Sequence, residues 1–140
     1  MKRLIYEVAA FGHSEELAWD ELRLRNWLRG LVFDNELYLG MMDREGRLDQ
    51  VPWLYEAGIE YETDPPGVEL YARIPEVIER GTADCKKLSA WRIAELRYRC
   101  GVEAKIHFYS RILPNGHRLY HVQVRWPNGL VEDPSKALGM

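Results

Sequence analysis

Cysteine is scarce in this 140-residue chain, which contains only Cys85 and Cys100. So low a count excludes the dense disulfide scaffold of small secreted proteins. The chain also lacks an apolar run near the roughly 20 residues that a bilayer-spanning helix requires, so we expect no membrane span. Its first seven residues, MKRLIYE, become charged too soon for a signal peptide, and we expect none.

A large excess of charge of either sign is also missing. The formal net charge is −3 and the sequence pI is about 5.8, so we expect no general attraction to nucleic acid or to an anionic membrane. Repeats, low-complexity tracts and interdomain linkers are not found. The length and the 46% hydrophobic content predict one globular domain over residues 1–140, with a core that needs no disulfide or metal.

Helical spacing is clearest from Asp84 to Cys100, where Ser89, Ile93 and Leu96 form one stripe with Cys100. Gly101 follows at the position of a left-handed cap. We therefore predict a largely buried helix with Cys85 in its first turn and Cys100 as a small core residue at its end. A helix of this length separates the two cysteines by roughly 22 Å, too far for a disulfide. Free thiols favour a reducing, intracellular location.

The segments before this helix are less regular. We predict a strand over residues 3–10 that Phe11-Gly12-His13 interrupts, then a helix capped by Ser14. Residues 31–50 allow more than one assignment. Ile74 to Ile78 fits a short helix with Pro75 in its first turn.

The segments after the helix alternate between apolar and polar residues, as strands do. This pattern covers residues 102–108 and residues 119–126, where His121 and Gln123 share the polar face. Pro127-Asn128-Gly129 then turns the chain towards Asp133. Taken with the helices, these strands predict an α+β fold in which a buried helix packs on an antiparallel sheet.

Cys85, His121 and Asp133 follow one another in the order of a nucleophile, a base and an orienting carboxylate. A cysteine in the first turn of a helix meets unpaired N–H groups and the positive end of the helix dipole, which favour the thiolate. His121 would exchange the proton, and Asp133 would fix the imidazole tautomer. The backbone N–H of Cys85 is a candidate oxyanion donor, and Trp53 and Tyr61 are candidates for a second.

The length of one turn tests this hypothesis. A two-residue loop at Asn128-Gly129 would place Asp133 opposite Val124, on the face away from His121. A three-residue loop, with Gly129 left-handed, would place Asp133 opposite Gln123 and within side-chain reach of His121. The hypothesis therefore predicts the three-residue loop.

Simpler interpretations of the same residues exist. A cysteine at a helix start is more often structural, His121 could be a solvent-facing strand residue, and Asp133-Pro134 could simply begin a turn. A zinc site formed by His117, His121 and Asp133 is disfavoured, because residues four apart on a strand lie about 13 Å from each other. Nothing in the sequence implies a cofactor.

At these residues the sequence resembles the transglutaminase-like cysteine peptidase superfamily. The motifs that carry the resemblance are Ala83-Asp84-Cys85, the helix ending at Cys100-Gly101, His121-Val122 and Asp133-Pro134, within residues 74–135. The resemblance implies a transglutaminase-like or papain-like core. It also implies a catalytic triad of Cys85, His121 and Asp133 that acts on amide bonds of protein or peptide through a thioester acyl-enzyme.

The chain departs from the family pattern at two places. Ala83 stands where the family has glycine, and Lys86-Lys87 stand where it has acidic residues. The lysines would place positive charge beside the thiolate and so lower its pKa further. The departures also raise the alternative of a catalytically silent fold that serves as a protein-binding module. Segments such as Leu54-Tyr55-Glu56-Ala57-Gly58 are similar to small bacteriophage-encoded members, which implies phage structural proteins as partners and a virion setting.

Overall fold

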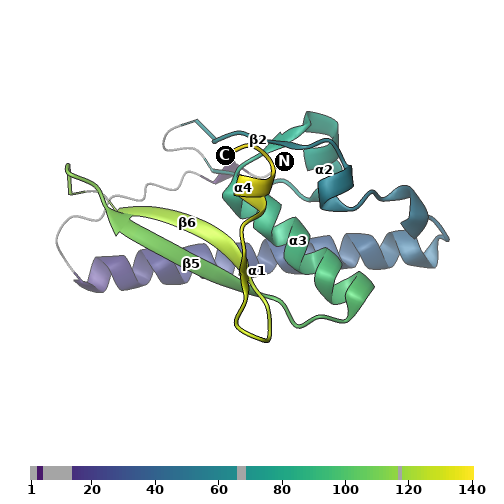
Figure 1. Ribbon diagram of the computed structural model, residues 1–140, viewed down its shortest axis with the longest axis horizontal. Coiled ribbons are helices and arrows are strands. Elements are labelled where there is room, and N and C mark those ends of the chain that lie inside the picture. Colours follow the sequence, from purple (N-terminus) through teal and green to yellow (C-terminus); the bar gives the residue numbers. More distant parts are fainter. Residues whose placement is uncertain (1–2, 5–13, 66–68, 117) are drawn as a thin grey trace.

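The structure is a computed structural model that describes residues 3–4, 14–65, 69–116 and 118–140. A long helix, α1 (Ser14–Arg44), extends along the molecule behind a second helix, α3 (Cys85–Cys100), and the hairpin of β5 (Lys105–Ile112) and β6 (Arg118–Arg125) lies beside them (Figure 1). A short strand, β7 (Val131–Glu132), extends the hairpin into a three-stranded antiparallel sheet. The predicted α+β class is confirmed, since helices pack on this sheet.

The remaining elements are short. In chain order they are β1 (Arg3–Leu4), the 3-10 turns Leu48–Gln50 and Leu54–Glu56, β2 (Glu60–Tyr61), β3 (Glu69–Leu70), α2 (Ile74–Arg80), β4 (Thr82–Ala83) and α4 (Pro134–Ala137). Three of them bear on the site. β2 pairs with β4 in parallel and brings Tyr61 beside Ala83, while α4 contacts α3 near the start of that helix (Figure 1).

Helix α1 resolves the assignment of residues 31–50, because it continues as far as Arg44. Its buried positions recur at helical spacing and include Leu28, Leu31 and Leu39. Asn35 is buried among them because its Oδ1 accepts a 2.8 Å hydrogen bond from the N–H of Ile74, one of the unpaired donors at the start of α2. The predicted strand is described only at Arg3–Leu4, and the remainder of residues 3–10 and the break at residues 11–13 lie outside the described residues.

Helix α3 begins one residue after the predicted start at Asp84 and ends at Cys100 as predicted, and Gly101 follows it with a left-handed φ of 65°. Most of the helix is buried, with Leu88 and Ile93 fully enclosed. The expectation that Cys100 belongs to the core is wrong, because its side chain is exposed. The reason is that Val102 N donates to Leu96 O at 3.0 Å, so that the chain after the cap folds back over an earlier turn and leaves Cys100 outside.

Candidate active site

Asp84 and the first turn of α3 position Cys85. Asp84 has an extended backbone and its Oδ1 accepts from Lys87 N at 3.2 Å, so it is the N-cap of the helix. Cys85 is therefore the first helical residue, at the positive end of the helix dipole. Its side chain is only 7% exposed, and its thiol is not in a disulfide. The sequence prediction for this residue's position is confirmed.

A hydrogen bond one turn later holds this end of α3 against the sheet. Ser89 Oγ donates to Val122 O at 3.0 Å, and both residues are buried. Val122 is the neighbour of His121 on β6, and Ser89 lies four residues after Cys85. The contact therefore fixes the cysteine-bearing turn of the helix relative to the strand that carries the histidine.

The turn between β6 and β7 has three residues. Trp126 N donates to Leu130 O at 2.8 Å, and Gly129 has a left-handed φ of 88°. Val124 pairs with Glu132, so the same register places Asp133 opposite Gln123. The three-residue loop that the Cys-His-Asp hypothesis requires is confirmed.

Asp133 holds two structural elements at once. Its Oδ2 lies 2.8 Å from His121 Nε2 and accepts from Gln123 Nε2 at 3.1 Å. Its Oδ1 accepts from the N–H groups of Ser135 and Lys136 at 3.1 and 3.4 Å, which makes Asp133 the N-cap of α4. Asp133 therefore begins a turn, as the simpler interpretation of Asp133-Pro134 expects, and it also bonds to His121.

Electrostatics keep Asp133 ionised. Burial raises the pKa of its carboxyl, but the hydrogen bonds from His121 and Gln123 and the charge of His121 outweigh burial and lower the pKa below its usual value. Because a carboxylate only accepts hydrogen bonds, Nε2 of the ring carries a proton in this contact. Nδ1 is then the ring nitrogen that can exchange a proton with another group.

The residue before Asp133 anchors β7 from the opposite side. Glu132 accepts from Arg92 Nε at 2.6 Å, from Tyr55 at 2.5 Å and from Trp126 Nε1 at 3.2 Å. Arg92 belongs to α3, so these bonds tie the strand to the helix that begins at Cys85. Since consecutive strand residues point to opposite faces, this anchor directs Asp133 towards His121.

Cys85, His121 and Asp133 line the same cavity, which has a volume of about 510 Å³. The cavity lies between the start of α3, the hairpin and α4. Its other lining residues are Tyr61, Tyr109, Arg111, Leu119, Tyr120, Gln123, Lys136 and Met140. The structure therefore brings the three predicted site residues to one cavity, although they are up to 48 positions apart in the sequence.

Of the two candidates for a second oxyanion donor, only Tyr61 lines this cavity. Burial raises the pKa of the Tyr61 phenol, and negative charge at Cys85, Asp84 and Asp133 adds to this effect while Lys86 opposes it. The phenol thus keeps its proton and can donate. Trp53 instead lies against the guanidinium of Arg99, 4.5 Å from ring centre to Cζ.

The two lysines that follow Cys85 are ion-paired. Lys87 is 2% exposed and its Nζ lies 2.7 Å from Asp64 Oδ2 and 3.4 Å from Asp84 Oδ1, while Lys86 Nζ lies 2.6 Å from Asp84 Oδ2. Burial raises the pKa of Asp84, but the two lysines outweigh it and lower that pKa. Their positive charge is therefore shared with buried carboxylates and is not directed at the cysteine alone.

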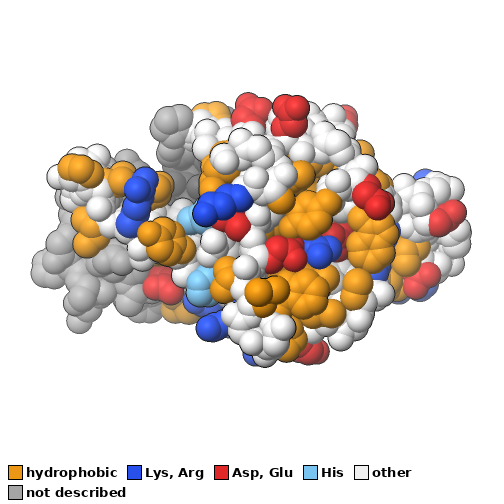
Figure 2. Space-filling model, viewed as in Figure 1, with side chains coloured by type: hydrophobic (Ala, Val, Ile, Leu, Met, Phe, Trp, Pro, Cys, Tyr) orange, Lys and Arg blue, Asp and Glu red, His pale blue; other side chains and the backbone are white. Residues whose placement is uncertain are grey.

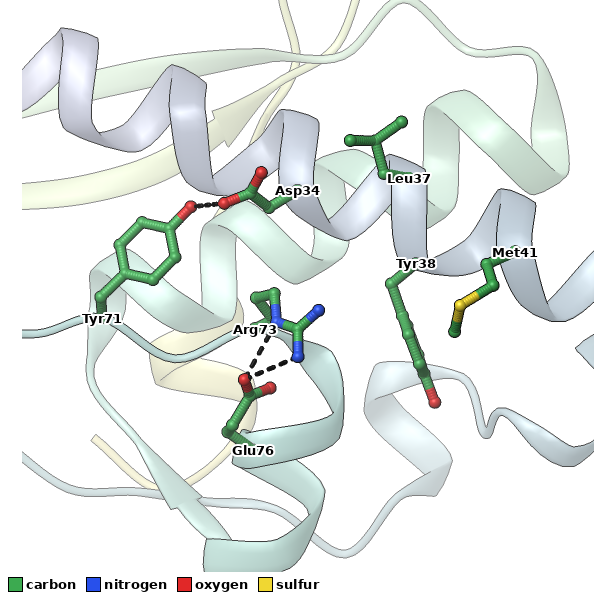
Figure 3. Close-up of a pocket in the computed structure, with 7 residues that line it drawn as sticks. All are labelled: Asp34, Leu37, Tyr38, Met41, Tyr71, Arg73 and Glu76. Carbon is green, nitrogen blue, oxygen red and sulfur yellow. Dashed lines mark hydrogen bonds and ion pairs between the residues drawn. The ribbon is translucent and has the colours of Figure 1, made fainter. Parts of the chain in front are cut away.

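A second cavity, of about 410 Å³, lies between α1 and α2 (Figure 3). Its polar groups bond to each other: Tyr71 donates to Asp34, and Arg73 pairs with Glu76 at 2.9 Å. The residues described around it include neither cysteine nor histidine, which are found together at the first cavity.

Among the described residues no group of three or more His, Cys, Asp or Glu side chains could hold a metal ion, and His117 lies outside them.

Comparison of the chain with protein-family models, with curated proteins and with solved structures found no match. Within the described part of the chain, none of the helices is both long and apolar enough to cross a bilayer.

Sequence reasoning missed two partners of the site. Gln123 stands two residues after His121 on the same strand face, and that spacing alone could have indicated a shared carboxylate. Asp64 could not have been found in this way, because its bond to Lys87 joins segments 23 residues apart through a loop with no regular pattern.

Proposed function

We propose that this protein is a thiol-dependent hydrolase or acyl transferase that acts on amide bonds of a protein or peptide. One observation carries the proposal: Cys85, His121 and Asp133 line one cavity, and His121 Nε2 lies 2.8 Å from Asp133 Oδ2. A nucleophile, a base and a group that orients the base are the minimum set for covalent acyl transfer.

In the proposed mechanism the Cys85 thiolate attacks the carbonyl carbon of the amide. The S–C bond forms, the C–N bond breaks, and His121 transfers its proton to the departing amine. The thioester that remains is then attacked by water or by a second amine, whose proton passes to His121, and the thiol is regenerated. Asp133 holds the imidazole in one tautomer and stabilises its charged form.

The backbone N–H of Cys85 and the phenol of Tyr61 are the donors proposed for the oxyanion. The first is one of the unpaired N–H groups at the start of α3. The second lines the cavity and is held beside Ala83 by the pairing of β2 with β4. This pairing also gives Ala83 a structural role in a strand, so the absence of glycine there does not prevent the fold.

We further propose that the fold is a transglutaminase-like or papain-like core. Support comes from the placement of the cysteine at the N-terminus of a buried helix, packed against an antiparallel sheet that carries the histidine. The alternative is a catalytically silent member that binds proteins or assists virion assembly. Lys86 and Lys87 favour this alternative, because they replace the acidic residues of the family pattern. Both lysines form salt bridges, which give them a structural role that needs no catalytic one.

Alkylation of the cysteine by iodoacetamide at pH 6 tests the proposal. A Cys100→Ser background leaves one thiol to label. We expect Cys85 to react on the order of a hundredfold faster than a free cysteine, because an ordinary thiol with a pKa near 8.5 is almost wholly protonated at this pH. Labelling no faster than that of a free thiol would exclude the mechanism and favour the silent module.

Two variants identify the partners of the thiol. His121→Ala should abolish most of the rate advantage, since the thiolate loses its counter-charge. Asp133→Asn should reduce it by about tenfold, and it is the better-matched change because asparagine can still cap α4. Circular dichroism of both variants checks that the fold is retained.

A further inference from the structure

Two basic side chains line the Cys85 cavity, Arg111 from β5 and Lys136 from α4. Neither has an acidic partner within the part of the chain that the structure describes. The single acidic side chain in the described lining, Asp133, is already engaged by His121 and Gln123. The two basic side chains are therefore able to bind an anionic ligand in the cavity, although the net charge of the whole chain is negative.

The pairing of the hairpin explains how Arg111 comes to the site. Tyr109 lies directly opposite His121, and Arg111 lies opposite Leu119. Because side chains two apart on a strand share a face, all four residues belong to the face that carries the histidine. Arg111 and Leu119 form the next pair on this face, two residues farther towards the hairpin tip and roughly 7 Å along the strands from His121.

The same face is apolar beside the basic groups. Tyr109 and Leu119 are 56% and 46% exposed, which is large for such side chains on the wall of a cavity. Figure 2 views this side and shows basic side chains over the outer end of the hairpin and over α4, with a histidine between them and apolar side chains nearby. The wall of the Cys85 cavity therefore carries both basic side chains and exposed apolar side chains.

We propose that this face is a subsite for an acyl donor that carries a carboxylate close to the reacting amide. Arg111 and Lys136 would bind the carboxylate, and Tyr109 and Leu119 would contact an adjacent apolar side chain of the same peptide. The inference rests on the proposed function of Cys85 and narrows its substrate to acidic peptides. The carboxylate can belong to an Asp or Glu side chain or to a peptide C-terminus.

Iodoacetate and iodoacetamide form a matched pair of probes, because they differ in one negative charge and both transfer a carbon to the thiolate with loss of iodide. In the Cys100→Ser background, we expect the ratio of their rates at Cys85 to exceed the ratio for free cysteine. Each cation within about 6 Å contributes roughly threefold in water. The excess should decrease as salt is added.

Arg111→Gln and Lys136→Gln should each lower this ratio about threefold, and Arg111→Glu should lower it further. Because both reagents react with the same thiolate, a change in the reactivity of the thiol itself leaves the ratio of the two rates unchanged. Arg125→Gln is the matched control, because Arg125 is also an exposed arginine of the hairpin but lies four residues beyond His121 on β6, outside the lining of this cavity. A ratio that stays raised in the double variant Arg111→Gln/Lys136→Gln would overturn the subsite.

The two reagents also separate this inference from the proposed function. Slow reaction with iodoacetamide contradicts the catalytic role of Cys85, whereas fast reaction with an unraised ratio contradicts only the subsite. Chloroacetyl-Leu-Glu-amide and chloroacetyl-Leu-Gln with a free carboxylate distinguish a side-chain from a terminal carboxylate. Faster labelling by either than by chloroacetyl-Leu-Gln-amide supports the subsite, and equal rates for all three contradict it.

Discussion

The two ends of α3 each carry a cysteine, yet their surroundings differ in almost every respect. Cys85 begins the helix, is 7% exposed and lines a cavity with His121 and Asp133. Cys100 ends the helix, is exposed and is followed by a left-handed glycine. The helix dipole favours a thiolate at the first end and disfavours it at the second. Identical residues on one helix thus differ in chemistry because of where the helix begins and ends.

The ion pairs at the two ends of the helix also differ in their burial. At the start of α3, Asp84, Lys87 and Asp64 form ion pairs in which each side chain is at most 9% exposed. Near the other end, Arg97 pairs with Glu36 at 3.5 Å with both side chains partly in solvent. Buried ion pairs rarely increase stability compared with apolar residues, but they fix geometry. We infer that the pairs at the first end hold the cysteine-bearing turn in place.

The largest effect that we predict is the loss of this buried pairing. Lys87→Met keeps most of the side-chain volume but removes the cation that lies 2.7 Å from Asp64 and leaves Asp84 paired with Lys86 alone, and we expect it to lower the free energy of unfolding by about 3–5 kcal/mol. Urea denaturation measures the change. Arg97→Met, near the other end, is the comparison: it removes a partly exposed ion pair and a 2.8 Å hydrogen bond from Arg97 Nε to Ala104 O, and it should cost no more than about 2 kcal/mol. Equal losses would show that the two ends do not differ in this way.

A smaller effect should appear as pH falls. The pKa values of Asp84 and Asp133 are lowered in the folded protein, so both carboxylates stabilise the fold above the usual aspartate pKa of 3.8. That stabilisation is lost as pH falls through the lowered values, while the raised pKa of buried Glu95 acts in the opposite direction. We expect unfolding midpoints to decrease below about pH 4. The decrease should be weaker in Asp133→Asn, and an unchanged slope there would contradict the assignment.

The sequence predicted the elements whose signals are local. The helix over residues 85–100, its glycine cap and the alternation around His121 depend on neighbours a few positions apart, and each is found in the structure. The three-residue loop was predictable only as a condition, because Pro127-Asn128-Gly129 is compatible with two registers. The structure has the register of the three-residue loop.

Other features depend on contacts between distant segments, which no local pattern reveals. The exposure of Cys100 follows from the way the chain folds back over Leu96, and the pairing of Lys87 follows from a loop 23 residues earlier. The pairing of Tyr61 with Ala83 is of the same kind. The order Cys, His, Asp indicated the candidate site, whereas its cavity and its basic lining required the fold.

The smallest predicted effect concerns the cap at the far end of α3. Gly101 has a φ of 65° and no heavy atom within 4 Å of the position of an added Cβ, so Gly101→Ala meets a conformational cost without a clash. We expect a loss of about 1 kcal/mol in the free energy of unfolding, and a smaller loss for Gly101→Asn, because asparagine tolerates this conformation better. The rate of Cys85 alkylation should not change, because the caps, ion pairs and hydrogen bonds that position the thiol all lie at the other end. Slower alkylation in Gly101→Ala would mean that the reactivity of the thiol depends on the whole helix, and that the two ends are not independent.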